Sequence, residues 1–195
     1  MAVEIEAKMR VDSFEPVRLR LRDGGAAGPN EHFEVNTFFD TEDRSLLAAD
    51  EGLRLRRDRE VASGAEKHVI TYKGPRQPGP LKNREEVEVD VSEAAPAVQL
   101  LERLGYLRTL SFEKRRESWK LDNCKVELDE VPHLGRFVEV EGPDEASVMK
   151  VREKLGLASR PIVKSSYIAL LMSHLQERGQ ATKTVTFENG TPRRS

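Results

Sequence analysis

Charged and apolar residues alternate along many segments of this chain, beginning with Glu4-Ile5-Glu6-Ala7-Lys8. Successive side chains of a β-strand point to opposite faces of the sheet. The charged residues of such a segment therefore share one face, and the apolar residues share the other. The same spacing recurs in segments 53–56, 67–73, 84–91, 114–116, 126–129 and 138–141. The pattern predicts a largely antiparallel sheet with one charged face and one apolar face.

Acidic and basic residues occur in equal numbers on the predicted charged face. The acids are Glu4, Glu6, Glu86, Glu88, Glu127, Asp129, Glu139 and Glu141. The bases are Lys8, Arg10, Arg54, Arg56, Lys73, Arg84, Lys114 and Arg116. Many of these charges come as same-sign pairs spaced two residues apart, and such neighbours on one strand repel each other.

Two arrangements are compatible with this face. In the first, an open sheet exposes its charges to water, and cross-strand ion pairs contribute a few tenths of a kcal/mol each. In the second, the sheet closes into a barrel with the charges inside and the apolar face outside under helices. Carboxylate pairs suit hard divalent cations such as Mg²⁺ or Mn²⁺, and Arg and Lys pairs suit phosphate. The same-sign pairs favour the barrel with a highly charged ligand.

Seven blocks, in this order along the chain, resemble the CYTH superfamily, also called the triphosphate tunnel metalloenzymes. They are Glu4-x-Glu6-x-Lys8, Leu53-Arg54-Leu55-Arg56, Thr71-Tyr72-Lys73-Gly74-Pro75, Arg84-Glu85-Glu86-Val87-Glu88, Lys114-Arg115-Arg116, Val126-Glu127-Leu128-Asp129 and Leu134-Gly135-Arg136-Phe137-Val138-Glu139-Val140-Glu141. The likeness covers about residues 1–171. It implies an α+β fold in which an eight-stranded antiparallel barrel forms a tunnel with a charged lumen, covered outside by about four helices.

The resemblance also implies roles for the charged residues, which we take as hypotheses. Phosphate would be bound by Lys8, Arg54, Arg56, Lys73, Arg84, Lys114 and Arg116. One or two Mg²⁺ or Mn²⁺ ions would be bound by Glu4, Glu6, Glu127, Asp129, Glu139 and Glu141. Lys8, Glu4 and Glu6 are the candidate catalytic residues. Glu86 and Glu88 are secondary candidates, since metal binding and ion pairing to Lys73 explain them equally well.

The blocks are most similar to members described as class IV adenylate cyclases, which convert ATP to cyclic AMP and pyrophosphate. The alternative is hydrolysis of inorganic tripolyphosphate or of a nucleoside or thiamine triphosphate. A non-catalytic sensor of polyphosphate or nucleotide is the third possibility, although a pure anion sensor needs no metal-binding carboxylates. The cyclase resemblance also suggests a homodimer.

Composition limits the other possibilities. The 195 residues predict one domain, and 32 basic against 34 acidic residues leave a net charge of −2. This balance gives no overall basic field for nucleic acid, so phosphate binding must be local. No apolar run is long enough for a membrane span, and the single Cys124, interpreted as a small buried residue, forms no internal disulfide. We therefore expect a cytoplasmic protein with no membrane contact.

Four amphipathic segments predict helices that cover the barrel. They begin near Asp12 or Ser13, near Ser92, at Asp144 and near Ser165 or Ser166, and each ends at a glycine. The domain is expected to span residues 1–179, and the polar segment 180–195 is expected to be a disordered tail. Phe38 and Trp119 are interpreted as packing residues. The loop 75–80 is either a lid over a tunnel entrance or a plain hairpin connection.

Overall fold

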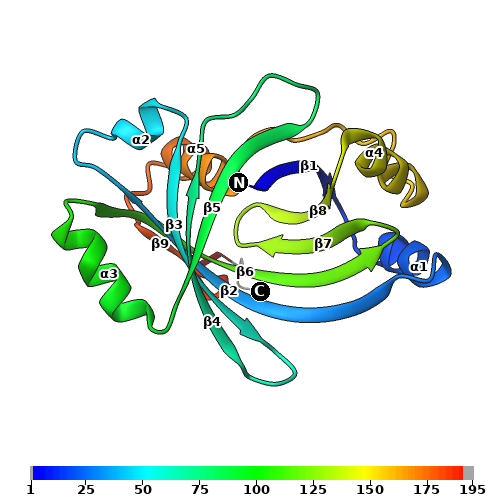
Figure 1. Cartoon of the computed structure of the whole chain (residues 1–195), viewed down its shortest axis with the longest axis horizontal. Helices are drawn as coiled ribbons and strands as arrows, with labels where there is room; N and C mark the ends of the chain where they lie inside the picture. The colour runs from blue at the N-terminus through cyan, green and yellow to red at the C-terminus, as the bar shows by residue number, and fades with distance from the viewer. Residues whose placement is uncertain (1, 191–195) are drawn as a thin grey trace.

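Eight antiparallel strands close into a barrel in the computed structural model, which describes the backbone of residues 2–190 and the side chains of residues 5–188 (Figure 1). The strands are β1 (Ala2–Val11), β2 (Ala27–Asp40), β3 (Gly52–Glu60), β4 (Glu66–Lys73), β5 (Lys82–Val91), β6 (Leu107–Leu121), β7 (Cys124–Val131) and β8 (Gly135–Gly142). Each predicted alternating segment forms one of these strands or part of one.

The order of strands around the barrel is β2-β3-β4-β5-β1-β8-β7-β6, and pairing of β6 with β2 closes it. The register places Lys8 of β1 opposite Glu139 of β8, and Arg116 of β6 opposite Asp129 of β7. Charged residues of neighbouring strands therefore face each other on the inner surface. The predicted α+β fold with an eight-stranded antiparallel barrel is confirmed, and the open-sheet alternative is excluded.

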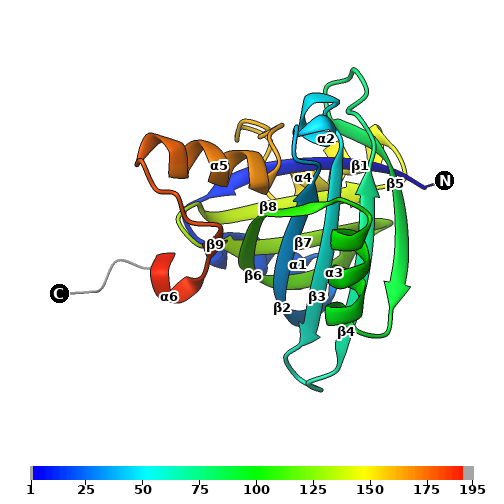
Figure 2. The same cartoon turned by 90° about the vertical axis from the view of Figure 1, so that its left-hand side faces the viewer.

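Four helices outside the barrel correspond to the four predicted ones (Figure 2). They are α1 (Glu15–Asp23), α3 (Ala94–Arg103), α4 (Glu145–Lys154) and α5 (Tyr167–Glu177). A further short helix, α2 (Ser45–Ala48), precedes β3. Within the described residues no helix is both long and apolar enough to cross a membrane.

Side-chain caps begin two of the helices as predicted. Asp144 accepts a hydrogen bond from the backbone N–H of Ser147 at 2.7 Å, and Ser166 accepts one from Ala169 at 3.4 Å. At α1 and α3 the predictions of Asp12 or Ser13 and of Ser92 were wrong, because Phe14 and Glu93 occupy the N-cap positions and make no side-chain cap. A cap requires a particular backbone geometry, which a Ser in the sequence suggests but does not guarantee.

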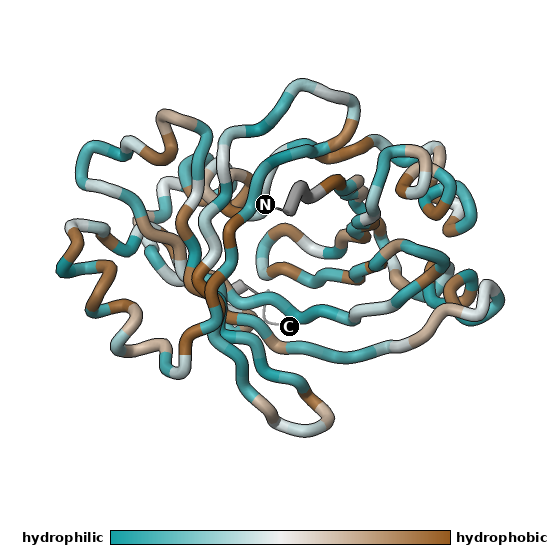
Figure 3. The backbone as a smooth tube through the Cα atoms, in the orientation of Figure 1, coloured by the Kyte–Doolittle hydropathy of each residue, from teal (hydrophilic) through white to brown (hydrophobic). Residues whose placement is uncertain are grey.

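The apolar outer face of the barrel packs against the helices and forms the core. Individual strands accordingly contain both hydrophilic and hydrophobic residues (Figure 3). Under α1 and α4, the side chains of Val126, Val138 and Val140 are fully buried together with Val148 of α4. Burying one such side chain stabilises the fold by about 1.5–3 kcal/mol. Cys124 belongs to the same cluster, which confirms its interpretation as a small buried residue.

Two further apolar clusters hold α3 and α5. Helix α3 buries Val98 and Leu101 against Leu53 and Leu55 of β3. Helix α5 buries Tyr167, Leu171 and Leu175 against residues that include Phe112, Val131 and Phe137. Because α5 contacts β6, β7 and β8, it brings its first turn beside the charged interior.

The end of the chain differs from the predicted disordered tail. Residues Thr184–Val185 form the short strand β9, which pairs in parallel with β6, and Phe187–Gly190 form α6. Val185 is fully buried, and the backbone N–H of Phe187 donates to Glu113 at 2.8 Å. The buried valine, the strand pairing and the contacts of Phe187 hold a segment whose own sequence shows no periodicity. Residues 191–195 lie outside the described part of the chain.

Candidate functional site

The barrel encloses a cavity of about 700 Å³ whose lining includes residues from all eight strands. The predicted site residues that line it are Glu6, Lys8, Arg54, Arg56, Lys73, Arg84, Glu86, Glu88, Lys114, Arg116, Glu127, Glu139 and Glu141. Asp129 is fully buried beside them. The side chain of Glu4 lies outside the described residues, and Arg10, placed on the same face, is exposed over the ring of Phe137.

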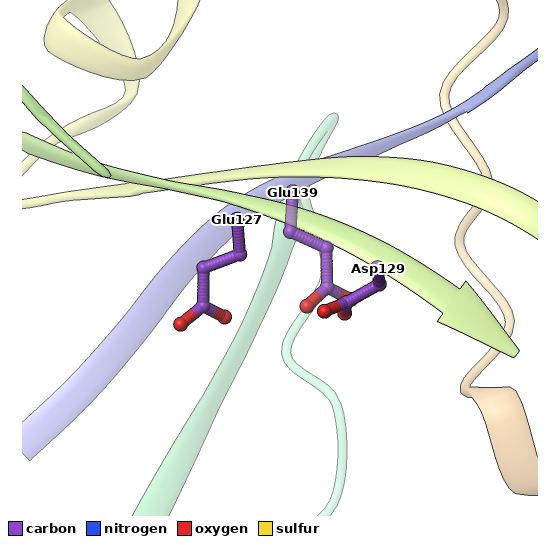
Figure 4. A group of neighbouring side chains, drawn as sticks. All are labelled: Glu127, Asp129 and Glu139. Carbon is purple, nitrogen blue, oxygen red and sulfur yellow. The ribbon is translucent and has the colours of Figure 1, made fainter. Parts of the chain in front are cut away.

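Three carboxylates from neighbouring strands converge inside the barrel. Glu127 and Asp129 on β7 and Glu139 on β8 leave the sheet on the same side (Figure 4). Each contributes an oxygen atom, and these oxygens lie within 4.8 Å of one another. Anionic oxygens at this spacing form a donor set that suits a hard divalent cation. We call these three residues the carboxylate cluster.

The guanidinium of Arg116 contacts every member of the carboxylate cluster. Its Nε donates to Asp129 at 2.6 Å, its Nη2 donates to Glu139 at 2.8 Å, and its Nη1 pairs with Glu127. A divalent cation at the cluster would therefore share or compete for the oxygens that Arg116 now satisfies. Glu34 of β2 adds a fourth carboxylate, with an oxygen 3.1 Å from Nζ of Lys114.

Burial and neighbouring charges set the protonation of this group. Burial alone would raise the pKa of Glu34, but the charges of Lys114 and Arg116 outweigh it and hold the pKa well below its usual value. The pKa of Glu139 is likewise held low, because Lys8 and Arg116 overcome the effect of burial. At Asp129 burial dominates and raises the pKa. Burial thus favours the protonated form of each carboxyl group, and nearby cations favour the ionised form; the balance of the two sets its charge.

Lys8 is held by three groups at the edge of the carboxylate cluster. Its Nζ donates to the carbonyl of Ser165 at 3.0 Å and lies 3.4 Å from Glu139. It also lies 4.1 Å from the ring centroid of Tyr167, whose hydroxyl donates to Asp129 at 2.9 Å. Helix α5 thus orients both a cluster carboxylate and the ammonium beside it.

The opposite wall, formed by β3, β4 and β5, presents cations with incomplete hydrogen bonding. Among the described residues, the buried Nε–H groups of Arg54, Arg56 and Arg84 have no acceptor. Burial lowers the pKa of Arg54, and the charge of Arg56 lowers it further. Two desolvated guanidinium groups side by side favour binding of an anion. We call Arg54, Arg56 and Arg84 the arginine wall.

Glu86 and Glu88 belong to this wall rather than to the carboxylate cluster. Glu86 pairs with Lys73, and Glu88 accepts a hydrogen bond from Thr71 at 2.9 Å. Glu88 also lies 3.7 Å from both Arg54 and Arg56. Of the two explanations considered for these acids, the geometry favours ion pairing over metal binding.

The barrel is open towards a second cavity of about 580 Å³. This cavity is lined by Asn30 and Asp58, which lie at the ends of β2 and β3 opposite to those that line the first cavity. Both cavities share Arg56, Arg116 and Glu127. The charged centre is therefore reached from both ends of the barrel.

The loop 75–80 is tethered beside the first cavity. Arg76 donates through its backbone N–H and its Nε to the carboxylate of Asp50, at 3.0 and 2.8 Å. Lys164 donates to the carbonyl of Gly79 at 3.1 Å. These contacts hold the loop between α2 and the segment before α5.

A comparison with protein-family models matches residues 2–167 to the CYTH domain. The chain belongs to the CYTH family. Proteins of this family are generally metal-dependent enzymes that act on triphosphates. The family match agrees with a barrel whose lumen holds both cations and carboxylates.

The proteins that are similar to this CYTH chain include two curated proteins and the solved structure of an archaeal protein. A protein of Methanocaldococcus jannaschii named "putative adenylate cyclase" is 28% identical over 177 residues, which are 86% of this chain and 98% of the relative. Adenylate cyclase CyaB of Aeromonas hydrophila is 28% identical, covering 86% of this chain and 87% of the relative. The structure of PH1819 protein from Pyrococcus horikoshii is 26% identical, with a TM-score of 0.76 over 88% of this chain and 99% of that one.

Sequence reasoning missed several polar residues of this CYTH lumen. Glu34 and Asn36 of β2 are each 1% exposed, and Lys82 donates to Glu6 at 2.7 Å. Alternation was a usable signal for all three, because Glu34 and Asn36 are spaced by two, and Lys82 precedes Arg84 by two. Tyr167 gave no such signal, since its role depends on how α5 packs against the barrel.

Proposed function

We propose that this protein is a divalent-metal-dependent enzyme that acts on a triphosphate bound in the barrel lumen. The observation that carries the proposal is the pairing of two walls across one cavity. In the arginine wall, three buried Nε–H groups have no acceptor among the described residues, and the carboxylate cluster has three converging oxygens. A triphosphate with its metal ion complements both walls.

The cations of the lumen would bind the phosphate oxygens. Arginine binds phosphate through two parallel hydrogen bonds, and lysine binds it as a point charge. A phosphate oxygen near Arg54 and Arg56 would supply acceptors for their Nε–H groups, which have none in the described part of the chain. Lys8 and Lys114 lie on the side of the carboxylate cluster, where they would neutralise charge close to the metal.

The carboxylate cluster would hold Mg²⁺ or Mn²⁺. Its oxygens are hard anionic donors that converge on one point, which is the arrangement that a hard divalent cation needs. Lys8, Lys114, Arg116 and Lys125 now balance the charge of these carboxylates and of Glu34. A metal held there would stabilise charge on the phosphates and would lower the pKa of the nucleophile. Glu6 and Glu141 line the same cavity outside the cluster and would act from its rim.

The reaction that we favour is an adenylate cyclase-like conversion of ATP to cyclic AMP and pyrophosphate. In this reaction the ribose 3′-hydroxyl oxygen attacks the α-phosphorus, and the bond to the departing pyrophosphate breaks. Such transfers depend on positioning and charge stabilisation more than on covalent help from the protein. Arg54, Arg56 and Arg84 would hold the departing pyrophosphate. The curated relatives named adenylate cyclase support this choice.

The second candidate is a triphosphatase, in which water attacks the terminal phosphorus, the bond to the bridging oxygen breaks, and orthophosphate and the remaining diphosphate are released. The second cavity favours it, because an opening that reaches Arg56 and Arg116 gives water a path to the charged centre. Both candidates use the same cations and carboxylates. They differ in which nucleophile lies in line with the bond that breaks.

Product analysis separates the candidates. Purified protein is incubated with Mg²⁺ or Mn²⁺ and, in separate reactions, with ATP and with tripolyphosphate, and the products are resolved by chromatography. We expect cyclic AMP and pyrophosphate from ATP. Orthophosphate from tripolyphosphate without cyclic AMP would select the triphosphatase. Metal-independent turnover, or no turnover of either compound, would contradict the proposal.

A further inference from the structure

Among residues 5–188, three side chains donate hydrogen bonds to Asp129, and one of them is uncharged. Arg116 donates through Nε at 2.6 Å and through Nη2 at 2.5 Å, and Nζ of Lys114 donates at 3.4 Å. The third donor is the hydroxyl of Tyr167, which lies 2.9 Å from Oδ2 of Asp129. The charge of each donor decides whether it can stay when a divalent cation binds to the carboxylate cluster.

A divalent cation beside Asp129 would repel the two charged donors. Like charges a few ångströms apart repel strongly where little water screens them, and Asp129 is fully buried. A phenol hydroxyl carries no net charge at neutral pH, and it occupies one of about four lone-pair sites of a carboxylate. The hydrogen bond from Tyr167 can therefore persist while Asp129 binds a metal ion through its remaining lone pairs.

Packing fixes the position of the Tyr167 ring independently of this hydrogen bond. The ring meets that of Phe137 edge to face, with the centroids 5.2 Å apart and the planes at 73°. Phe137 in turn pairs with Asp129 in the register of β7 and β8. Leu171 and Leu175 of α5 lie in the same buried cluster as Tyr167. The fold thus presents the hydroxyl to Asp129, and no side chain has to become ordered when a metal binds.

The segment that leads into α5 is anchored on β1. The backbone N–H of Val163 donates to the carbonyl of Lys8 at 2.7 Å, and Nζ of Lys8 donates to the carbonyl of Ser165 at 3.0 Å. Tyr167 follows two residues later as the first residue of the helix. Its position is therefore set from two sides, by β1 and by the ring of Phe137.

We propose that Tyr167 is a positioning residue for the metal site, and that its hydroxyl holds Asp129 in the orientation that binds the divalent cation. It acts through Asp129 and contacts neither the metal nor the phosphates. The inference rests on the proposed function, since it takes the metal at the carboxylate cluster from it. Partners that hydrogen-bond to the ligands of a metal typically contribute 10–100-fold to metal affinity.

Tyr167→Phe tests the inference, because it removes the hydroxyl and keeps the ring with its contacts to Phe137 and Lys8. The probe is imidotriphosphate, a triphosphate analogue whose P–N–P bridges resist hydrolysis. Titration calorimetry measures the affinity of the metal-free compound, with a chelator present, and that of its Mn²⁺ complex. We expect the wild-type protein to bind the complex more tightly than the metal-free compound. In Tyr167→Phe the affinity for the complex should fall by about 10-fold or more, and the affinity for the metal-free compound should not change.

Tyr72→Phe is the matched control. Tyr72 also donates its hydroxyl to a carboxylate, but this acceptor, Glu51, belongs to neither the carboxylate cluster nor the arginine wall. Both affinities should keep their wild-type values in this variant, and the same selective loss in Tyr72→Phe would contradict the inference.

Three results with the other proteins are decisive. Equal affinity of the wild type and Tyr167→Phe for the complex would overturn the inference. An equal loss for both ligands in Tyr167→Phe would also overturn it, since that result marks a general structural role. If the wild-type protein binds the complex no more tightly than the metal-free compound, the metal site of the proposed function itself fails.

Discussion

The two walls of the lumen carry the same kinds of charge but satisfy them differently. On β7 and β8, the carboxylates of Glu127, Asp129 and Glu139 are all in contact with Arg116. On β3 and β5, Arg54, Arg56 and Arg84 each keep a buried Nε–H for which residues 5–188 offer no acceptor. The carboxylate cluster thus finds its hydrogen-bond donors within the protein, whereas the arginine wall keeps Nε–H donors that the described residues do not satisfy.

This difference indicates what each wall binds. A wall with Nε–H groups that have no acceptor gains hydrogen bonds when an anion binds. The carboxylate cluster already pairs with Arg116, so a metal ion binds there only if those contacts change. We therefore expect triphosphate to bind without metal through the arginine wall, and metal to be needed for turnover through the carboxylate cluster.

The largest effect is expected at the carboxylate cluster. Glu139→Gln removes one of the anionic ligands that we propose for the metal, and it should lower metal-dependent turnover by about 10²–10³-fold. Initial rates with saturating Mg²⁺ measure this loss. Glu88→Gln is the matched control, because Glu88 belongs to the arginine wall and its side chain is 46% exposed. Comparable losses in both variants would show that the two walls are not functionally distinct.

The next effect concerns the arginine wall. Arg56→Ala should weaken binding of tripolyphosphate by about 1.5–3 kcal/mol, since it removes a charged hydrogen-bond donor. Calorimetry without metal measures the change. Arg57→Ala is the neighbouring control, because the side chain of Arg57 is 53% exposed and pairs with Glu66 on the surface. An unchanged affinity in Arg56→Ala, or an equal loss in Arg57→Ala, would count against inward binding.

Ligand-induced stabilisation offers a third comparison of the walls. Tripolyphosphate at about ten times its Kd, without metal, should stabilise the fold by about 1.4 kcal/mol and raise Tm by about 3–6 °C. Glu139→Gln should keep this shift and Arg56→Ala should lose it at the same ligand concentration. Differential scanning fluorimetry measures both. Loss of the shift in Glu139→Gln alone would reverse the assignment of the walls.

The smallest effect is expected outside both walls. Burial lowers the pKa of His133, and the charges of His174 and Arg178 lower it further. The folded state therefore binds this proton less well than the unfolded state, whose His pKa is about 6.5, so stability should fall as pH drops through that value. The ring is partly exposed, which keeps the effect below about 1 kcal/mol.

His133→Asn should reduce this pH dependence. Asn tolerates the positive φ of 64° at this position. The measurement is Tm at about pH 7.5 and about pH 5.5, near either side of the unfolded pKa. Tripolyphosphate affinity at a fixed pH should not change. A variant with the full pH dependence would contradict the role of His133, and a changed affinity would link α5 packing to the arginine wall.

The strands and their inner faces were predictable because alternation is a local property. Pairs such as Glu127 and Asp129 show their common face directly in the sequence. The same signal on β2 was overlooked, since Glu34 is followed by Asn36 and Phe38 and only one of the three is charged. Residues spaced by two still share one face of a strand when their polarity is mixed, but the sequence then does not indicate that this face is charged.

Other features depend on contacts between distant segments and were not predictable from local pattern. Tyr167 reaches Asp129 because of how α5 packs, and β9 forms because Val185 is buried beside β6. The convergence of Glu139 with β7 required the register between two strands. The sequence predicted which residues face inward, and the strand register determined which of them meet.

A crystal structure with Mn²⁺ and a triphosphate tests the central claim most directly, because anomalous scattering locates the metal independently of the phosphates. We predict the metal between Glu127, Asp129 and Glu139, with the phosphate oxygens against Arg54, Arg56 and Arg84. Phosphates bound outside the barrel, or a metal held away from the carboxylate cluster, would contradict the account.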